Sequence, residues 1–322
     1  MKNKVAVVLF NLGGPDSLNA VQPFLNNLFR DPDIFNIPFG QKLFAKIISN
    51  RRAPKVIGQY KNIGGKSPIN EWTEIQRKML EEYLTETNSD FEFSVFTAMR
   101  YWNPLIAEIV KVIKNESFSK IVLLPLYPHY SITTTGSSFN EWDRHYRGNK
   151  SKLLYVNNYF NNEKYIRALN ERIDETIQRF PADHRKDIQL LFSAHGTPVS
   201  LVKKGDPYNI QIQKTVDEVM ILRNFSHKNY LCYQSKVGPV KWLGPSTNKI
   251  IEELAVKGYK DLLIIPISFV SDHIETLFEL DREYRKIAEK EGIDNYIVTK
   301  GLNDSNTFIS ALAEETNKVL SR

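Results

Sequence analysis

The sequence predicts an α/β protein in which parallel sheets are joined by crossover helices. Along 322 residues, apolar runs of strand length alternate with segments of helical periodicity, which is the pattern of parallel strands with crossover connections. Two short stretches of the first half also return in the second half. The length suits two α/β domains or one large one, and 42% hydrophobic residues supply material for a sizeable core.

The order of the expected elements follows from these runs. Strands are expected at 5–12, 91–99, 121–127, 153–156, 188–194, 230–234, 262–269 and 296–299. Helices are expected near 17–29, 69–86, 104–115, 162–179, 209–224, 246–257, 274–290 and 305–320. A further amphipathic helix is expected to bury Leu43, Phe44, Ile47 and Ile48.

Two pairs of stretches resemble each other across the chain. LFNLGGP at 9–15 resembles LFSAHGTP at 191–198, and each has the pattern of a strand that leads through a glycine turn into a helix. IVLLPLYPHYS at 121–131 resembles LLIIPISFVSD at 262–272. These echoes favour two similar halves with a boundary near 145–160 and a cleft between them, and the alternative is chance similarity of buried strands.

Composition excludes several classes of protein. The net charge of +6 favours anionic partners, but no Lys/Arg block or aromatic-basic motif indicates nucleic acid. The only cysteine, Cys232, excludes intrachain disulfides and an all-cysteine iron–sulfur site within one chain. The first apolar run, 5–10, is too short for a signal peptide, and no run approaches the ~18 residues of a membrane span. We therefore expect a cytoplasmic protein without a spanning helix.

Acidic residues gather after the apolar strand that leads into 266–284, PISFVSDHIETLFELDREY. In an α-helix from 274 onward, Glu275, Glu279 and Glu283 would stand at i, i+4 and i+8 on one face, with Asp272 a turn earlier. Each such like-charge pair costs a few tenths of a kcal/mol, about 0.2–0.5. Either water screens this column or a cation uses it, and its position at the carboxyl end of a strand favours a site.

Two histidines are expected at strand ends. His195 follows the strand 188–194 and His273 follows the strand 262–269. A lone histidine is more often structural, but imidazole at such an edge can accept a proton near neutral pH or bind a metal. The chain has neither paired Cys-x-x-Cys motifs nor His-Glu-x-x-His, which disfavours a structural zinc site. Nitrogen and oxygen ligands around His195, His273 and Glu275 would suit a loosely held divalent first-row metal.

Aromatic and polar groups also gather around the expected strand ends, near Tyr60, Arg100, Tyr127 and Trp242. Aromatic walls with a few Arg, Ser and Tyr donors suit a large planar ligand that carries carboxylates. The turn at 13–15, Gly-Gly-Pro, lacks a phosphate-loop motif, and its proline removes an N–H donor. It is either a tight turn or a close backbone approach to a flat ligand.

The segment 29–48 is rich in Phe and Ile around prolines, and Arg51 and Arg52 follow it. Ile34, Phe35, Ile37 and Phe39 fall in an irregular stretch, where so much apolar surface needs a partner. We expect this lip, about 29–55, to contact an apolar ligand or a membrane surface, with the arginines meeting ligand carboxylates or lipid headgroups.

Together these motifs resemble the ferrochelatases, which insert Fe²⁺ into a porphyrin late in haem synthesis. The ordered motifs that carry the resemblance include RRAPKVIGQYKNIGGKSPI, MRYWNP, LPLYPHYS, LFSAHGTP, GDPY, YQSKVGPVKWLGPST and SDHIETLFELDREY, and they extend over roughly 4–321. The resemblance implies two Rossmann-like, chelatase-type domains with the porphyrin in a cleft between them. The domains would be 1–154 and 155–304, with a C-terminal helix, 305–322, that returns to the first.

The resemblance also implies the roles of individual residues. His195 and Glu275 would be the catalytic pair and the primary metal contacts, on opposite sides of the macrocycle. Asp272, His273, Glu279 and Glu283 would form a secondary polar trail on a helix that is widened into a π-type segment in this family. The implied porphyrin contacts are Leu12, Arg51, Arg52, Tyr60, Ser67, Arg100, Tyr127, Trp242 and Phe269.

The expected reaction exchanges two pyrrole protons of protoporphyrin IX for one Fe²⁺, with His195 as the proton acceptor and the side of Glu275 handling the ion or the protons. Iron is then a substrate, and neither a resident cofactor nor an iron–sulfur cluster is expected. The alternatives are coproporphyrin III as substrate, cobalt or nickel as metal, and a carrier of haem or porphyrin without catalysis. A peripheral contact with a membrane is possible, and the protein is expected to be a monomer or a homodimer.

Overall fold

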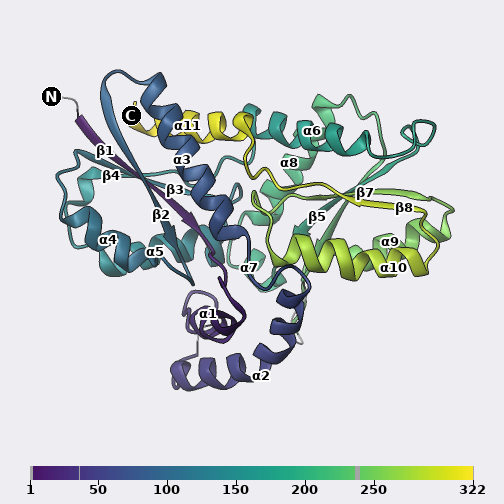
Figure 1. Cartoon of the computed structure of the whole chain (residues 1–322), viewed down its shortest axis with the longest axis horizontal. Helices are drawn as coiled ribbons and strands as arrows, with labels where there is room; N and C mark the ends of the chain where they lie inside the picture. Colours follow the sequence, from purple (N-terminus) through teal and green to yellow (C-terminus); the bar gives the residue numbers. More distant parts are fainter. Residues whose placement is uncertain (1–2, 36, 236–239, 322) are drawn as a thin grey trace. The chain divides into compact units, whose positions relative to one another are not determined.

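The computed structural model describes residues 3–35, 37–235 and 240–321, and these form two compact units (Figure 1). The first unit comprises Met1–Tyr159 together with Asn303–Arg322, and the second comprises Phe160–Leu302. The boundaries expected from the sequence were 154/155 and 304/305.

The first unit contains a four-stranded parallel sheet in the order β2-β1-β3-β4. Its strands are β1 (Asn3–Asn11), β2 (Phe91–Met99), β3 (Lys120–Pro125) and β4 (Leu153–Tyr155). Its helices are η1 (Leu18–Ala20), α1 (Val21–Phe29), α2 (Gln41–Lys61), α3 (Ile69–Thr87), α4 (Ile106–Lys114), η2 (Ile132–Gly136), α5 (Ser137–His145), η3 (Lys150–Lys152) and α11 (Asn306–Leu320).

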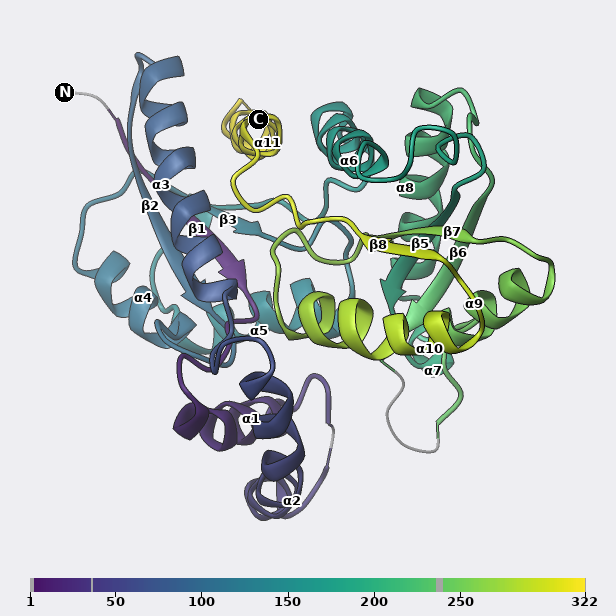
Figure 2. The same ribbon diagram turned by 45° about the vertical axis from the view of Figure 1, so that its right-hand side comes forward.

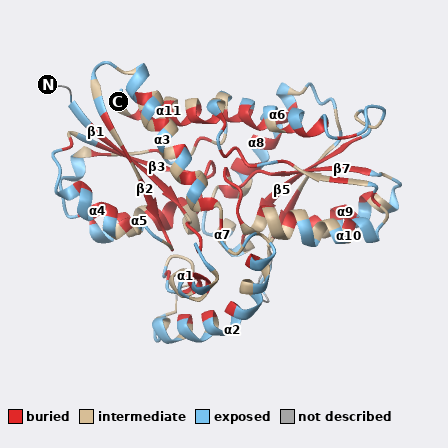
Figure 3. Cartoon of the chain, in the orientation of Figure 1, coloured by how far each residue is buried: buried red, intermediate tan, exposed pale blue. Residues whose placement is uncertain are grey.

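Helices cover both faces of this sheet. One face packs Val8 and Phe10 of β1 against α4 and against Trp142 of α5, and the other is covered by α3 and α11. Because β1 is central, its run VAVVLF is buried on both faces (Figure 3). The C-terminal segment is tied to α3 by a hydrogen bond from Gln76 Nε2 to the carbonyl of Asn303, 2.8 Å long.

Helix α2 buries a different face from the one expected. It packs on α1 through Ala45, Ser49 and Ala53, which are small and four residues apart. Phe44, one of the expected core residues, does pack, because its ring meets those of Phe29 and Phe35. The prediction was wrong for Leu43 and Ile47, which are 63% and 55% exposed. Close helix packing selects small side chains, so the larger ones face away.

The second unit repeats the topology of the first in a sheet ordered β6-β5-β7-β8, again parallel throughout. Its strands are β5 (Gln189–His195), β6 (Asn229–Gln234), β7 (Asp261–Pro266) and β8 (Asn295–Val298). Its helices are α6 (Glu163–Ile177), α7 (Val199–Lys203), α8 (Tyr208–Leu222), α9 (Thr247–Val256), η4 (Glu275–Glu283) and α10 (Tyr284–Lys290). Helices α9 and α10 lie on one face of this sheet, and α6 and α8 lie on the other (Figure 2).

The two echoes in the sequence correspond to equivalent strands. β1 and β5 hold the same place in their sheets, and so do β3 and β7, each of which ends in a proline. Each of the latter strands leads into a π-helix, η2 in the first unit and η4 in the second. The expected α/β architecture and its two similar halves are therefore confirmed.

Cys232 lies in the core of the second unit, on β6 between the sheet and α9. Its Sγ accepts a weak hydrogen bond from the Thr247 hydroxyl at 3.4 Å, and burial raises the pKa of the thiol to about 11. Within the part of the chain that the structure describes, no helix combines the length and apolar character that a membrane crossing requires.

Candidate active site

His195 is the last residue of β5, at the carboxyl end of a central strand, which is where open α/β sheets place their sites. Its imidazole Nδ1 lies 2.9 Å from Glu275 Oε2, and 35% of the side chain is exposed. The ring of Phe269 stands edge-on to the imidazole with centroids 5.9 Å apart. The structure thus brings together three residues that the sequence predicted for the site.

Glu275 opens the π-helix η4 and is held by donors from two other elements. Besides His195, Gln234 Nε2 donates to its Oε2 at 3.1 Å and the Ser235 hydroxyl at 3.4 Å. Burial by itself would raise the pKa of this carboxyl, but the charge of His195 and the hydrogen bond from it lower the pKa to about 2. Glu275 is therefore ionised throughout the neutral range.

The pKa of His195 moves in the complementary direction. Burial disfavours the imidazolium, but the charge of Glu275, the hydrogen bond to it and the charge of Glu279 outweigh burial and raise the pKa. The pair therefore tends to hold a proton on the imidazole. Since Nδ1 is engaged with Glu275, Nε2 is the ring nitrogen that remains for exchange with a substrate.

Glu279 has a different environment on the same π-helix. Its Oε1 accepts from the backbone N–H of Ser235 and from the Tyr284 hydroxyl, each at 2.8 Å, and its Oε2 accepts from the Ser235 hydroxyl. Burial and the charge of Glu275 raise its pKa. Ser235 itself sits at φ +63°, a conformation that these contacts with Glu279 hold in place. The site therefore offers one carboxyl with a lowered pKa and one with a raised pKa.

The column expected along an α-helix is not straight. In a π-helix the hydrogen bonds run from i to i+5, so residues four apart do not stack directly. Glu275 and Glu279 both reach Ser235, whereas Glu283 is exposed at the far end of η4. The regular stacking of all three was wrong, while the widened helix implied by the family resemblance is present.

Asp272 and His273 are both buried at the start of this segment. Asp272 Oδ1 accepts from the Thr276 hydroxyl and from the backbone N–H of Gly301, each at 3.1 Å. His273 Nδ1 lies 3.1 Å from the carbonyl of Ser271, which can only accept, so the neutral ring carries its proton there. Its Nε2 lies 3.9 Å from Glu275 Oε2, and burial lowers its pKa. Asp272 thus orders the entry to η4, and His273 is a neutral neighbour of Glu275.

Trp242 is the remaining predicted residue of the second unit. It pairs with Pro198 in an isolated β-bridge just after the turn at His195 and Gly196. A side chain at Gly196 would stand 2.6 Å from the carbonyl of Gln234 and 3.5 Å from the indole. Glycine is therefore required for the close approach of this turn to the carbonyl of Gln234, and the indole lies in ordinary contact beside the same turn.

In the first unit, predicted site residues gather around the carboxyl end of β1. A side chain at Gly14 would overlap Ser67, whose backbone N–H donates to the carbonyl of Pro15 at 2.8 Å. The glycine turn therefore serves close packing of the chain on itself, the tight-turn alternative. Leu12 is half-buried just after β1, and its carbonyl accepts from the N–H of Tyr101 at 3.0 Å.

Arg100 lies in a buried polar network. Its guanidinium donates to Asp31 Oδ1 at 2.9 Å and to the Ser137 hydroxyl at 2.8 Å, and Asp31 also accepts from the Tyr101 hydroxyl at 2.6 Å. The arginine is thus neutralised inside the unit. Asp31 was missed by sequence reasoning. Its place in a Pro-punctuated loop indicated a turn, but nothing in the sequence indicated that it pairs with Arg100.

The other predicted residues of this unit are distributed between the core and the surface. Tyr60, at the end of α2, and Tyr127, just after β3, are buried. Arg51 and Arg52 are exposed on α2, and the Arg52 guanidinium lies over the Phe29 ring at 5.7 Å.

Sequence reasoning did not assign a role to Gln234, Ser235, Tyr284, Tyr208 or Ser268. All five stand within quoted stretches: Gln234 and Ser235 in YQSKVGPVKWLGPST, Tyr208 in GDPY, and Ser268 and Tyr284 in PISFVSDHIETLFELDREY. The motifs marked their neighbourhood, but their contacts with site residues follow only from the fold. For the predicted metal ligands, no three His, Cys, Asp or Glu side chains within 3–35, 37–235 and 240–321 are grouped to hold one ion. Of the predicted ligands, His195 and Glu275 lie in hydrogen-bond contact.

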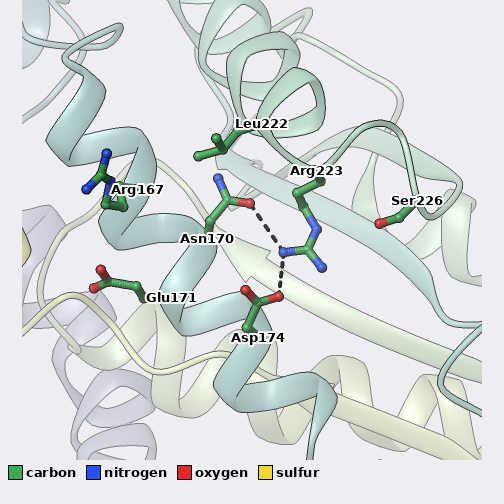
Figure 4. Close-up of a pocket in the computed structure, with 7 residues that line it drawn as sticks. All are labelled: Arg167, Asn170, Glu171, Asp174, Leu222, Arg223 and Ser226. Carbon is green, nitrogen blue, oxygen red and sulfur yellow. Dashed lines mark hydrogen bonds and ion pairs between the residues drawn. The ribbon is translucent and has the colours of Figure 1, made fainter.

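A cavity of about 370 Å³ lies elsewhere in the second unit, between α6 and the end of α8 (Figure 4). Arg223 crosses it and donates to Asp174 Oδ1 at 2.7 Å and to Asn170 Oδ1 at 3.2 Å. None of its lining residues was predicted for the site. Since its principal cation is already paired, we assign it no part in the chemistry of His195.

Comparison with known proteins gives consistent matches over the whole chain. A family model described as Ferrochelatase matches residues 4–320. A ferrochelatase of Geotalea uraniireducens is 45% identical over 100% of this chain and 99% of its own length. One of Aquifex aeolicus is 45% identical over 97% of this chain and 98% of its own length.

Among solved structures, SirB from Bacillus subtilis with Fe³⁺ is similar, with a TM-score of 0.55 at 13% identity. The match covers 99% of this chain and 96% of SirB. At this identity the likeness concerns the fold alone, and it agrees with the two parallel sheets flanked by helices.

Proposed function

The chain belongs to the ferrochelatase family and is a metal chelatase of haem biosynthesis, and on this basis we propose that it inserts Fe²⁺ into protoporphyrin IX. The family assignment confirms the resemblance found in the sequence. Both substrates of the reaction, a porphyrin and a metal ion, follow from the family. The observation that carries the mechanism is the hydrogen-bonded pair of His195 and Glu275 at the end of β5.

The reaction breaks two pyrrole N–H bonds, forms iron–nitrogen bonds and releases two protons. In this proposal His195 accepts a pyrrole proton through Nε2, after its own proton has left, and Glu275 stabilises the imidazolium that forms. Glu279, whose pKa is raised, relays a proton away from the reacting centre. Fe²⁺ contacts Glu275 and His195 as it enters. Asp272, His273, Glu279 and Glu283 form the polar surroundings of that path.

The proposed porphyrin contacts remain those implied by the family. In the second unit, Phe269 and Trp242 support this proposal because both pack beside the turn that carries His195. In the first unit the contacts are proposed for Leu12, Arg51, Arg52, Tyr60, Ser67, Arg100 and Tyr127. The internal pairing of Arg100 with Asp31 makes it a donor that acts from a fixed position.

Protoporphyrin is favoured over coproporphyrin by the character of the lip. Phe39 is 93% exposed, and Leu43 and Ile47 follow it at four-residue spacing on α2. An apolar lip suits the porphyrin with two carboxylates better than the one with four.

The test is an anaerobic assay that follows the absorbance change on metallation with each porphyrin. We expect kcat/KM at least about tenfold higher for protoporphyrin, equivalent to roughly 1.4 kcal/mol. A preference for coproporphyrin would reverse the substrate assignment and leave the chelatase activity standing. A rate no faster than the uncatalysed reaction would favour a carrier. Cobalt and nickel in competition with Fe²⁺ identify the preferred metal.

The same lip supports a peripheral contact with membranes. Through this contact the protein would receive a poorly soluble porphyrin. Exposed Phe39, Leu43 and Ile47 are flanked by the exposed lysines 42 and 46, and this combination suits an anionic bilayer surface. In co-sedimentation with vesicles that contain phosphatidylglycerol, Leu43→Ser with Ile47→Ser should reduce binding several-fold. Val256→Ser removes an equally prominent side chain, 86% exposed, and should not. Equal binding by both variants would contradict the proposal.

We also propose that no resident cofactor takes part, because iron enters as a substrate. Metal analysis of the purified protein should find well under about one iron per chain, without the visible absorbance of an iron–sulfur cluster. Stoichiometric bound iron that survives dialysis against a chelator would contradict this.

A further inference from the structure

The backbone of His195 is hydrogen-bonded by two side chains that no part of the mechanism above uses. The N–H of His195 donates to the Ser268 hydroxyl oxygen at 2.8 Å. The Tyr208 hydroxyl donates to the carbonyl of His195 at 3.0 Å. The two hydroxyl oxygens lie 2.6 Å apart. Both side chains are buried, Tyr208 at the start of α8 and Ser268 just beyond β7.

Counting protons fixes the direction of every bond in this group. The carbonyl of His195 can only accept, so the single Tyr208 proton is donated to it. The short contact between the hydroxyls must then use the proton of Ser268, with the Tyr208 oxygen as acceptor. Ser268 in turn accepts from the N–H of His195. The result is a closed ring of three hydrogen bonds through both backbone groups of one residue.

This ring lies where the pairing between β5 and β7 ends. His195 is the final residue of β5, and the next strand, β7, ends at Pro266 opposite Ser193. On that side His195 has no strand partner, so Ser268 and Tyr208 replace the missing ladder. The imidazole is then located from two directions, by its backbone ring and by the 2.9 Å contact with Glu275.

We propose that Tyr208 and Ser268 are positioning residues for the reaction, and that they hold His195 against Glu275 without contacting the substrate. This inference rests on the proposed function, in which His195 accepts the proton. A displacement of the imidazole by a fraction of an ångström changes the rate of proton transfer and leaves the porphyrin contacts in place. The expected signature is therefore a loss in kcat with KM unchanged.

The experiment compares Tyr208→Phe, Ser268→Ala and the double variant in the full-length protein. Each single variant should lower kcat about tenfold and change KM for porphyrin and metal by less than about twofold. Because each single variant already removes two of the three hydrogen bonds of the ring, the double variant should be little slower than either single one.

Tyr165→Phe is the matched control. Tyr165 is also a buried tyrosine of this unit, and its hydroxyl donates to a backbone carbonyl, that of Ile267 at 3.3 Å. We expect it to lose thermal stability like Tyr208→Phe and to keep the wild-type kcat. A readout that does not depend on chemistry is amide exchange at His195, which should become about tenfold faster in Tyr208→Phe and stay unchanged in Tyr165→Phe.

Three outcomes would overturn the proposal: wild-type kcat in both single variants, multiplicative losses in the double variant, or an equal loss of kcat in Tyr165→Phe. A failure of the proposed function is distinguished from these, because the wild-type protein itself would then not metallate a porphyrin. In that case the amide exchange still reports whether the ring holds His195.

Discussion

Glu275 and Glu279 stand four residues apart on one π-helix, yet their pKa values move in opposite directions. Glu275 faces His195 and stays ionised, whereas burial and the negative charge of Glu275 raise the pKa of Glu279. Gln234 contributes to the difference, because the Ser193 hydroxyl donates to its Oε1 at 2.8 Å and so turns its N–H group toward Glu275. Two identical carboxyls thereby acquire different tasks.

His195→Ala should lower kcat by at least about 100-fold, the usual contribution of a positioned proton acceptor. Porphyrin binding, measured by fluorescence quenching, should change little. His184→Ala is the control, because His184 also faces a carboxylate of this unit, Asp261 at 3.2 Å, at the opposite end of β7. Its kcat should match the wild type. A His195→Ala enzyme of near wild-type rate would remove this residue as the base.

The stability of the wild type relative to Glu275→Gln should depend on pH with a plateau. Glu275 has a folded pKa of about 2 against 4.5, so its contribution is present above pH 4.5 and lost as pH falls toward 2. His195 has a raised pKa, so its contribution is full below 6.5 and lost as pH rises through the folded value. In urea unfolding, the free energy of unfolding of the wild type relative to Glu275→Gln should be roughly 2 kcal/mol larger on the plateau between pH 4.5 and 6.5 than at pH values beyond both folded pKa values. A difference independent of pH would contradict the ion pair.

At the scale of elements, α2 shows how a helix can bury its small residues and expose its large ones. Ala45→Leu should destabilise the protein by about 1–3 kcal/mol, because Ala45 is fully buried in the contact with α1. Leu43→Ala, two residues away, should change stability by less than about 0.5 kcal/mol. Thermal unfolding of the two variants measures both. The reverse ranking would show that the apolar face is the packed one.

The same helix explains which parts of the fold sequence reasoning could reach. The strand β2, Phe91–Met99, was predicted to the residue, because the apolar and polar residues over most of its length alternate as they do in a half-buried strand at the edge of a sheet. The face that α2 buries was not predicted, because it depends on which helix lies against it. The helix over Ser137–His145 was also missed; it buries Trp142 but has few other apolar residues.

The candidate site divides in the same way. His195 and Glu275 were reachable because they stand at strand ends in recognisable motifs. Tyr208 and Ser268 also lie in quoted stretches, but their role was not predicted, because they contact His195 across 13 and 73 residues of sequence. Asp31, the buried partner of Arg100, precedes it by 69 residues in the sequence (100 minus 31). Side-chain networks of this kind are specified by the fold, and no local pattern announces them.

At the scale of the whole molecule, two sheets share one strand order, and only the second ends a central strand in a histidine. β1 ends instead in Asn11, whose amide donates to the Thr73 hydroxyl at 2.9 Å. The first unit is completed by the C-terminal helix α11, whose Phe308 is fully buried and lies beside Tyr159 with ring centroids 6.3 Å apart. The C-terminal helix thus belongs to the first unit.

Phe308→Ala should therefore destabilise the first unit by about 3–5 kcal/mol. Hydrogen exchange should become faster in β1, β3 and α3, and should remain slow in β5 and β7 of the second unit. Equal loss of protection in both sheets would mean that the units unfold as a single cooperative body.

The solitary thiol has a practical consequence for labelling chemistry. At neutral pH only about one Cys232 in ten thousand is a thiolate, given a pKa of about 11, and the side chain is fully buried. The folded protein should therefore resist maleimides for hours and react only after denaturation, as mass spectrometry would show. Cysteines introduced on either unit would carry fluorophores or spin labels without background, so the native chain is already suited to spectroscopic distance measurement.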